Sequence, residues 1–322
     1  MSTQARCFHI GFVYLVILGY VTLSSNGWGQ APKTAKIIFS SHRDGNRDIY
    51  VMDIDGKNPL NLTNHPGFDF SPAWSPDGRR IAFFSQRQEG NGLYVMDADG
   101  KNQRYLAPKS HFANPTWSPD SKEIAFNCPV GERIGICVID ANGGDLRNLT
   151  RHPFDDEQPA WSPNGRKIAF TSNREGVGIF VMDTDGNNQR RLTPLRTSDT
   201  YPAWSPDGKK IAFESSKNGS IDIHVMNADG TDRRRLTRHP REDRYPSWSP
   251  DGQKIVFYSR RDGNSEIYVM DAHGNNQRNL TNHPAADGFR RPAWFDPVFA
   301  FSVLPAGEHI VSWGWLKVLD SK

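Results

Sequence analysis

Short hydrophobic runs recur along most of the chain, and turns rich in glycine, proline, aspartate and asparagine separate them. In one copy the runs are Lys210–Phe213, Ile221–Met226 and Arg233–Thr237. The run Ile221–Met226 alternates apolar and polar residues, as a half-buried β-strand does. Ser205–Gly208, just before the first run, places proline, aspartate and glycine as a tight turn requires. A polar stretch then leads to the next tryptophan, so one copy predicts four antiparallel strands.

This four-strand pattern repeats six times. Each copy contains a variant of the phrase Pro-Ala-Trp-Ser-Pro-Asp-Gly, and its tryptophans are spaced 43 to 46 residues apart. They are Trp74, Trp117, Trp161, Trp204, Trp248 and Trp294. A period of this length with four strands per copy is typical of a β-propeller. The sequence therefore predicts an all-β fold, a six-bladed propeller of four-stranded antiparallel blades, and no long amphipathic helix within residues 36–294.

The two ends of the repeat region predict how the ring closes. The first copy opens at Lys36–Phe39, which is the second strand of a blade without a first strand before it. The last copy continues past its outer strand into Pro292–Trp294, an additional first strand. We expect this C-terminal strand to become the innermost strand of blade one, because that pairing leaves no open sheet edge.

The repeated phrase resembles the WD-like propeller repeats of the TolB family, the periplasmic propellers of the Tol–Pal system. The resemblance covers about residues 36–297 in six tandem copies. It implies the same propeller fold and a role in binding. TolB itself has an α/β domain before its propeller, and we expect no counterpart of that domain in this chain.

The ends outside the repeats predict export. Residues 1–29 combine Arg6, an apolar core from Ile10 to Leu23 and small residues before Gln30, as a secretory signal peptide does. An uncleaved membrane anchor is the alternative. We expect a propeller over residues 34–297, a tail of uncertain structure over 298–322, a periplasmic or extracellular location, and no stable membrane span after signal cleavage.

Two cysteines fall in one predicted hairpin. The expected register sets Cys137 opposite Phe126, which makes Cys128 and Cys137 diagonal neighbours. Diagonal residues lie about 7–8 Å apart, at the limit of what a disulfide spans. An oxidising compartment favours the bond, and two free buried thiols are the alternative.

Charge and motifs exclude several classes of function. The chain has 39 Lys+Arg against 36 Asp+Glu, too balanced for a nucleic-acid-binding face. We interpret the basic run Arg233–Arg235 as a solvated outer strand. No nucleophile elbow, zinc motif or phosphate loop is present, so we predict no catalytic or metal residues. The Asp-x-Asp-Gly segments lack the glutamate of a calcium loop and predict hairpin turns.

The candidate binding residues lie in the loops that enter the inner strands, near the mouth of the predicted channel. The aspartates each precede a tryptophan by five residues, and His-Pro pairs recur just upstream. The full set is Asp69, Asp156, Asp199, Asp243, His65, His152, His239, His283, Tyr201 and Tyr245. One interpretation is that the aspartates stabilise their own loops. The other is a carboxylate ring that binds a cation, with calcium as the candidate, or a basic part of a partner.

These features favour a non-enzymatic secreted platform whose expected partner is a protein, a peptide or a cell-envelope polymer. We expect the channel-mouth face to bind, because its loops vary most between copies. We expect a monomer without a cofactor. The alternative is a propeller hydrolase or lyase that acts on a polysaccharide through channel-mouth carboxylates.

Overall fold

The computed structural model describes residues 29–300, apart from 88–89, 109–113, 218 and 289. The expected signal peptide and nearly all of the tail lie outside the described residues. Within them, no helix has the length and hydropathy of a membrane span.

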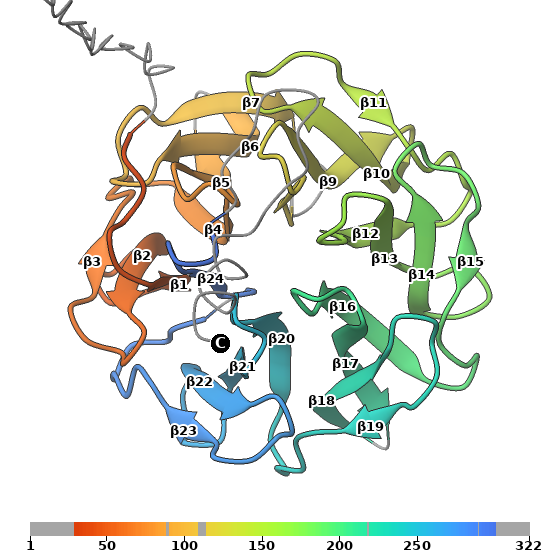
Figure 1. Cartoon of the computed structure of the whole chain (residues 1–322). Helices are drawn as coiled ribbons and strands as arrows, with labels where there is room; N and C mark the ends of the chain where they lie inside the picture. Colours follow the sequence, from red (N-terminus) through yellow and green to blue (C-terminus); the bar gives the residue numbers. More distant parts are fainter. Residues whose placement is uncertain (1–28, 88–89, 109–113, 218, 289, 301–322) are drawn as a thin grey trace, which may run out of the picture.

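Six four-stranded antiparallel sheets surround a central axis, as predicted (Figure 1). Blade 1 contains β24 (Ala293–Phe295), β1 (Lys36–Ser41), β2 (Asp48–Asp53) and β3 (Leu60–Asn61). Blade 2 contains β4 (Phe68–Trp74), β5 (Arg80–Arg87), β6 (Gly90–Asp97) and β7 (Arg104–Pro108). Blade 3 contains β8 (Thr116–Trp117), β9 (Glu123–Val130), β10 (Arg133–Asp140) and β11 (Arg147–Asn148).

The other three blades have the same order from the axis outward. Blade 4 contains β12 (Asp156–Trp161), β13 (Lys167–Ser172), β14 (Gly178–Asp183) and β15 (Arg190–Arg191). Blade 5 contains β16 (Ser198–Trp204), β17 (Lys210–Lys217), β18 (Ser220–Asn227) and β19 (Arg234–Arg235). Blade 6 contains β20 (Asp243–Trp248), β21 (Lys254–Ser259), β22 (Glu266–Asp271) and β23 (Arg278–Asn279).

The ring closes as the sequence predicts. The C-terminal strand β24 pairs antiparallel with β1, and three residue pairs form the contact: Lys36 with Phe295, Ile37 with Trp294 and Ile38 with Ala293. Figure 1 shows the two strands side by side although they come from opposite ends of the repeat region. Blade 1 is therefore completed by both ends of the propeller.

The hydrophobic core lies between the blades. Six clusters of buried residues each combine side chains from two adjacent blades. Ile37 and Phe39 of β1 pack toward blade 6, whereas Ile38 between them packs toward blade 2. Successive side chains of a strand point to opposite faces, so the second strands need a continuous hydrophobic run.

The prediction of a half-buried third strand was wrong. In β18 both faces are covered, because the neighbouring blades pack on either side. Asp222 is 3% exposed, and burial lowers the pKa of His224 to about 4. The polar positions of the alternating pattern are thus partly or fully covered. The buried Asp222 carboxylate contacts Thr237 and pairs with the exposed Arg235 of the outer strand.

The outer strands are shorter than predicted, and the Leu-Thr motif explains why. The run Arg233–Thr237 forms only the two-residue strand β19. The Thr237 Oγ1 then accepts the Ile223 N–H at 3.0 Å, where a strand carbonyl would otherwise bond. Four other blades repeat this contact with Thr63, Thr150, Thr193 and Thr281. Blade 2 has Ala107 instead of threonine, and its outer strand β7 extends to five residues.

The repeated tryptophan phrase links neighbouring inner strands. The indole N–H of Trp117 donates to the Ala73 carbonyl at 3.0 Å, and that of Trp204 donates to the Ala160 carbonyl at 3.1 Å. Trp248 repeats the contact with Ala203. Each of these three bonds joins a tryptophan to the alanine before the tryptophan of the preceding blade, and so links neighbouring inner strands. The indole N–H groups of Trp74 and Trp161 are buried without a hydrogen bond among the described residues.

Cys128 and Cys137 form a disulfide. The observed register sets Cys137 opposite Phe126 and Cys128 opposite Gly135, so the cysteines are diagonal neighbours as expected. Their Cα atoms are 5.7 Å apart, closer than an average diagonal pair and well within the span of a disulfide. Intracellular thiols are normally kept reduced, so the bond indicates an oxidising compartment.

The closing strand provides a test of the ring. A protein that lacks residues 291–322 has no β24 and therefore no inner strand in blade 1, and we expect insolubility or a large drop in Tm. The packing that this strand provides to two blade interfaces is large beside a typical total stability of roughly 5–15 kcal/mol. A chain that ends at Ala300 keeps β24 and serves as the control. Equal thermal melting of the two truncated proteins would refute the closure.

The disulfide provides a second test. Its cysteines are nine residues apart, and the chain-entropy model assigns a loop of this size roughly 2–3 kcal/mol. We expect a reductant to lower the Tm of the wild type by several degrees. The same reductant leaves the Tm of a Cys128→Ala/Cys137→Ala variant unchanged. A wild-type Tm that does not respond to the reductant contradicts a stabilising bond.

Candidate functional site

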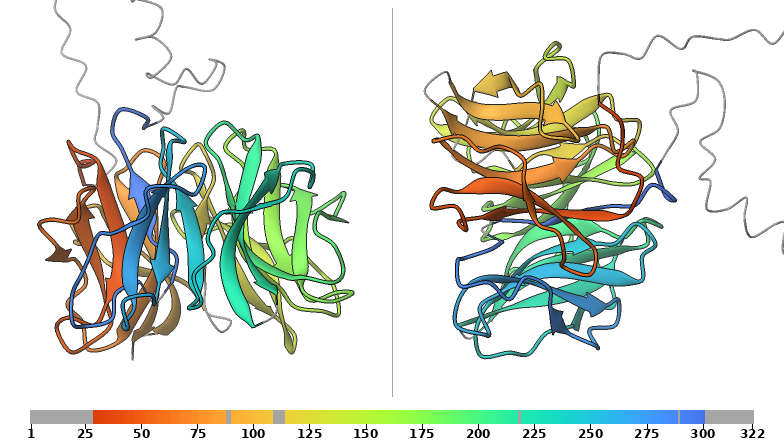
Figure 2. Two further views of the ribbon diagram at one scale, coloured as in Figure 1. Left: turned by 90° about the horizontal axis from the view of Figure 1, so that it is seen from below. Right: turned by 90° about the vertical axis from the view of Figure 1, so that its left-hand side faces the viewer.

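The ring has two chemically different faces, visible edge-on in Figure 2. We call one the turn face, because the Ser-Pro-Asp-Gly and Asp-x-Asp-Gly turns lie there. We call the other the loop face. It contains the loops that enter the inner strands and the turns that join the second and third strands. The antiparallel order of every blade places these two sets of connections at opposite ends.

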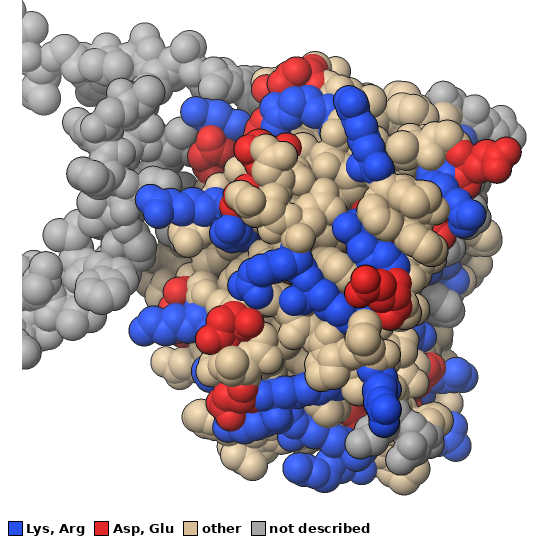
Figure 3. Space-filling view, turned by 90° about the vertical axis from the view of Figure 1, so that its right-hand side faces the viewer, with Lys and Arg blue, Asp and Glu red and all other residues tan. Residues whose placement is uncertain are grey.

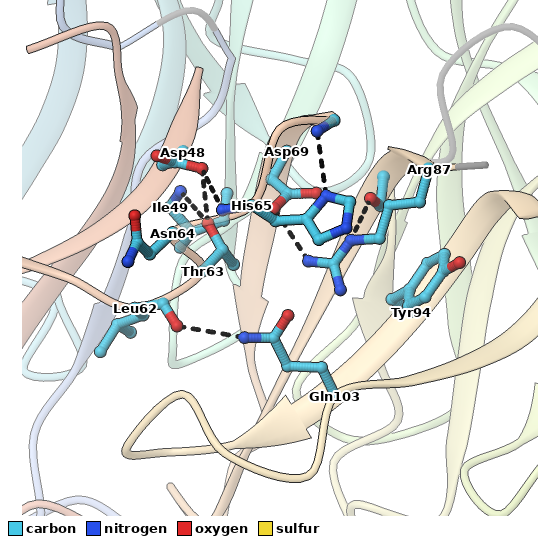
Figure 4. Close-up of polar contacts among 12 residues, drawn as sticks. Asp48, Ile49, Leu62, Thr63, Asn64, His65, Asp69, Arg87, Tyr94 and Gln103 are labelled. Atoms are coloured by element: carbon cyan, nitrogen blue, oxygen red, sulfur yellow. Dashed lines mark hydrogen bonds and ion pairs between the residues drawn. The ribbon is translucent and has the colours of Figure 1, made fainter. Parts of the chain in front are cut away.

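On the loop face, Asp69 is buried and bonded to an arginine (Figure 4). Arg87 donates to Asp69 Oδ2 at 2.9 Å and to the Ser85 hydroxyl at 2.8 Å. Its guanidinium also lies over the rings of Phe83 and Tyr94, at 5.5 and 5.0 Å from their centroids. Burial raises the pKa of Asp69, and the Ser85 and Arg87 contacts oppose that shift. The pair fastens the start of β4 to the end of β5, at the base of the loop that enters β4.

The other predicted aspartates are held in the same way. The further ion pairs are Asp156–Arg174 at 2.6 Å, Asp199–Arg233 at 2.7 Å, Asp243–Arg261 at 2.9 Å and Asp287–Arg43 at 2.7 Å. These aspartates are at most 1% exposed. The geometry favours the interpretation that they stabilise their loops, since each carboxylate bonds within its own blade. Among the described residues, no group of three or more His, Cys, Asp or Glu side chains is placed to hold a metal ion.

Neither Asp287 nor the pairing of these aspartates with arginines was identified from the sequence. Asp287 lies seven residues before Trp294 instead of five, and the longest spacing in the repeat, 46 residues, was the signal. Four of the arginines belong to a Ser-x-Arg motif after the second strand: Arg43, Arg87, Arg174 and Arg261. In blade 5 the residue at this position is Lys217, and Arg233 from the outer-strand side makes the bond. Arg233 is therefore not the solvated residue that we expected.

Blade 3 has a covalent link where the others have the ionic one. Its sequence places Phe112 at the aspartate position, Cys128 at the serine position and Cys137 at the aromatic position. The disulfide thus joins the second and third strands of blade 3. In blade 2, for example, Arg87 connects the same two strands, because it bonds Ser85 and lies over the Tyr94 ring. Each blade therefore has one strong cross-connection near the loop face.

The predicted histidines shape the loops. The Nδ1 atom of His65 accepts the Gly67 N–H at 2.9 Å, and that of His283 accepts the Ala285 N–H at 3.1 Å. His239 makes the same contact with Arg241. The ring of His152 stacks on Phe154 with centroids 5.3 Å apart. The structure thus assigns the His-Pro segments a local bonding role, and their contact with a partner stays a prediction.

The position before each inner-strand proline varies from blade to blade, unlike the rest of the phrase. We call this set the channel ring: Ser71, Asn114, Gln158, Tyr201, Tyr245 and Arg291. The first five have positive φ angles, from 41° to 57°. The following proline has no N–H to give to the ladder, and the pairing is interrupted there by a bulge, as between Glu157 and Ala160. Such strained positions often cluster where function lies.

The second strands support the channel ring from behind. The backbone N–H of Gln158 donates to Asn127 Oδ1 at 2.8 Å, and the backbone N–H of Tyr245 donates to Glu214 Oε1 at 2.7 Å. Both supporting residues come from the preceding blade and are buried. Burial raises the pKa of Glu214, and Arg244 at 3.3 Å opposes that shift. The bulges are therefore fixed by buried polar contacts.

Described residues line a channel cavity, a mouth cavity and a turn-face cavity on or near the axis. The channel cavity, about 180 Å³, is lined by five of the channel-ring residues, Tyr201 and Arg291 among them. The mouth cavity, about 370 Å³, lies on the loop face between blades 6 and 1. It is lined by Arg47, Glu242, Arg244, Tyr245, Tyr258, Arg260 and Arg290. A turn-face cavity of about 280 Å³ is lined mainly by the tryptophans, serines and prolines of the repeated phrase.

The two predicted tyrosines belong to these cavities. Tyr201 lines the channel cavity and Tyr245 lines the mouth cavity. Their rings meet edge to face, with centroids 4.6 Å apart, and Tyr258 packs on the other side of Tyr245. Of the predicted residues, these two are brought together beside the axis. The four aspartates are not.

The outer wall has a mixed charge pattern. Lysine and arginine side chains spread over it with acidic side chains between them (Figure 3). Arg234 pairs with Asp232 at 3.6 Å and Arg235 with Asp222 at 2.7 Å, so the basic run has acidic partners.

Exposed apolar side chains occur at three equivalent places on the loop face, where the chain enters an inner strand. Phe68 is the first residue of β4, whereas Phe154 and Leu195 lie just before β12 and β16. Their exposed fractions are 46%, 45% and 63%. Phe70, two residues after Phe68, is buried. Each exposed residue lies one to four positions before a buried aspartate, so the ion pairs hold the loops that present them.

The comparisons with known proteins agree with this geometry. The model of the TolB beta propeller domain matches residues 25–111, 107–201 and 194–295. These matches cover most of the chain, which therefore belongs to the TolB beta propeller family.

Individual relatives are more distant. A Tol-Pal system protein TolB from Geobacter sulfurreducens is 44% identical over 50 residues, which are 16% of this chain and 12% of that protein. The crystal structure of TolB from Acinetobacter baumannii superimposes with a TM-score of 0.72 at 24% identity, covering 81% of this chain and 66% of that one. This chain thus spans slightly less than two thirds of that structure.

The same fold occurs in an enzyme. A puromycin-hydrolyzing peptidase from Mycobacterium tuberculosis superimposes with a TM-score of 0.57 at 17% identity, over 78% of this chain and 44% of that one. The propeller alone therefore does not decide between binding and catalysis.

The buried ion pairs generate a stability prediction. Asp156→Asn leaves Arg174 buried opposite a neutral amide, and losing one partner of a buried pair costs about 3–5 kcal/mol. Asp185→Asn in the same blade changes an exposed turn residue and is the control, expected within about 0.5 kcal/mol of wild type. Urea unfolding measures both. Equal unfolding midpoints for the two variants would show that the ion pair does not stabilise the loop.

Proposed function

We propose that the protein is a non-enzymatic, exported binding platform that contacts a partner protein or peptide with its loop face. The observation that carries the proposal is the placement of exposed Phe68, Phe154 and Leu195 at equivalent places on that face. Exposed apolar residues are frequent anchors in protein interfaces. A rigid ring that holds variable loops is a common arrangement for recognition.

Family membership supports the proposal. The curated relatives are named as Tol-Pal system proteins, which describes components of a protein assembly. The disulfide supports export, because such bonds persist in oxidising compartments. The apolar segment of residues 10–23 supports a signal peptide that delivers the chain there.

The bonding of the acidic residues supports binding over catalysis. A glycoside hydrolase needs two carboxyl groups that face a common substrate. Here the loop-face aspartates each bond an arginine of their own blade, and Glu214 bonds Arg244. These carboxylates are engaged in holding the fold.

Two matched triple variants test the loop face. Phe68→Ser/Phe154→Ser/Leu195→Ser removes exposed apolar groups from the loop face. Ile54→Ser/Leu60→Ser/Leu146→Ser removes comparably exposed groups, at 39%, 60% and 55%, from the turn-face side. All six residues are exposed, so both variants should fold.

The readout is crosslinking capture from the native compartment, quantified for each protein that the wild type enriches. We expect the loop-face variant to lose most of the capture and the turn-face variant to keep it. The reverse result would place the interface on the turn face. Equal capture by wild type and both variants would show that these apolar groups do not bind.

A further inference from the structure

Arg291 places a positive charge in the channel without an acidic partner. It lies in the segment before β24, and its Nη2 donates across the axis to the Pro202 carbonyl of blade 5. Within the described residues, no carboxylate oxygen lies within 4.0 Å of it, and its Nε is buried without a hydrogen bond. Burial lowers the pKa of Arg291 to about 10, and Tyr201 and Glu214 oppose that shift only in part.

The mouth cavity beside it is also basic. Four arginines and one glutamate line it. Glu242 lies 3.6 Å from Arg244 and 3.5 Å from Arg260, and Arg244 also pairs with Glu214 at 3.3 Å. Burial and the nearby charge of Arg290 both lower the pKa of Arg47.

The channel and the mouth are adjacent. Arg290 and Arg291 are consecutive, and one lines each cavity. Arg290 donates to the Tyr201 hydroxyl and lies over the Tyr245 ring at 5.9 Å. The tyrosine pair thus separates the two cavities, and an arginine stands on each side of it.

We propose that the loop face binds an acidic peptide segment, with one carboxylate bonded to Arg291 in the channel and further carboxylates in the mouth cavity. A carboxylate matches the planar guanidinium and forms strong charge-assisted hydrogen bonds. The channel cavity of about 180 Å³ is lined by Asn114, Gln158 and Tyr201, whose amide and hydroxyl groups suit the rest of one acidic side chain. This inference rests on the proposed function and names the chemistry of the partner.

The experiment measures the anisotropy of a labelled hexaglutamate peptide added to the full chain as exported. We expect salt-sensitive binding by wild type, about 30-fold or more weaker binding by Arg291→Met, and unchanged binding by Arg234→Gln on the outer wall. A hexalysine peptide should not bind. Arg290→Gln is the second variant and should weaken binding in the same direction.

The stability of the free variant separates recognition from a structural role. Arg291 is half-buried, and a charge that is partly removed from solvent without a carboxylate partner adds no stability to the fold, so Arg291→Met should melt at or above the wild-type temperature without peptide. A strongly lowered Tm would assign Arg291 to the fold and overturn the proposal. Equal hexaglutamate binding by wild type and Arg291→Met would overturn it as well.

Three further outcomes would also overturn the assignment of an acidic partner peptide. If inorganic phosphate binds through Arg291 while hexaglutamate does not, the peptide assignment is wrong. If a chain ending at Ala300 binds hexaglutamate much more tightly than the full chain, the site is occupied by its own C-terminal residues, which overturns the assignment to a partner. If hexaglutamate fails to bind but the apolar loop-face variant still loses crosslinking capture, the proposed function stands and this inference falls.

Discussion

Every blade depends on its two neighbours, because the hydrophobic clusters lie between blades and none belongs to a single sheet. The pairing of β24 with β1 completes this cycle. Without it, Trp74 and Ile81 of blade 2 lose Phe295, and Val256 and Ile267 of blade 6 lose Trp294 as packing partners. The short closing strand thus affects two interfaces as well as its own sheet. The rigid frame that holds the loops follows from that closure.

The repeated sequence has a different structural role on each face of the ring. On the turn face, the same bonds hold the turns of the five copies in which serine follows the tryptophan. The Ser205 hydroxyl donates to Asp207 and accepts the Lys210 amide, for example. On the loop face, buried ion pairs hold the base of each loop while residues such as Phe154 and Leu195 remain exposed. A fixed base with a variable tip is suited to recognition, and the channel ring extends this variation into the axis.

The repeats predicted the fold well because their spacing, turn residues and end sequences all record the same geometry. The Trp spacing indicated six blades, the unpaired first strand indicated the closure, and strand register placed Cys128 beside Cys137. The ion pairs were harder to predict. Asp69 and Arg87 are 18 residues apart, and an arginine beside a turn is normally solvated. Phe83 and Tyr94 cover the Arg87 guanidinium, and this contact follows from the folded structure and not from the local sequence.

The channel ring was recognised only in part, for a related reason. Tyr201 and Tyr245 were expected at the mouth, but Ser71, Gln158 and Arg291 occupy the same position in other blades without a shared chemical character. Arg291 follows Arg290 in an ordinary basic dipeptide, so its sequence does not indicate burial. Its setting depends on blades 1 and 5 meeting across the axis, which no local pattern encodes.

The central claim is that one face of the ring serves recognition while the other maintains the fold. Hydrogen–deuterium exchange of the protein with and without its captured partner measures this most directly, because it reports protection along the whole chain. The account predicts that binding protects amides in the loops before β4, β12, β16 and β24, with little change in the Ser-Pro-Asp-Gly turns. Protection concentrated in those turns, with unchanged exchange in the loops, would contradict it.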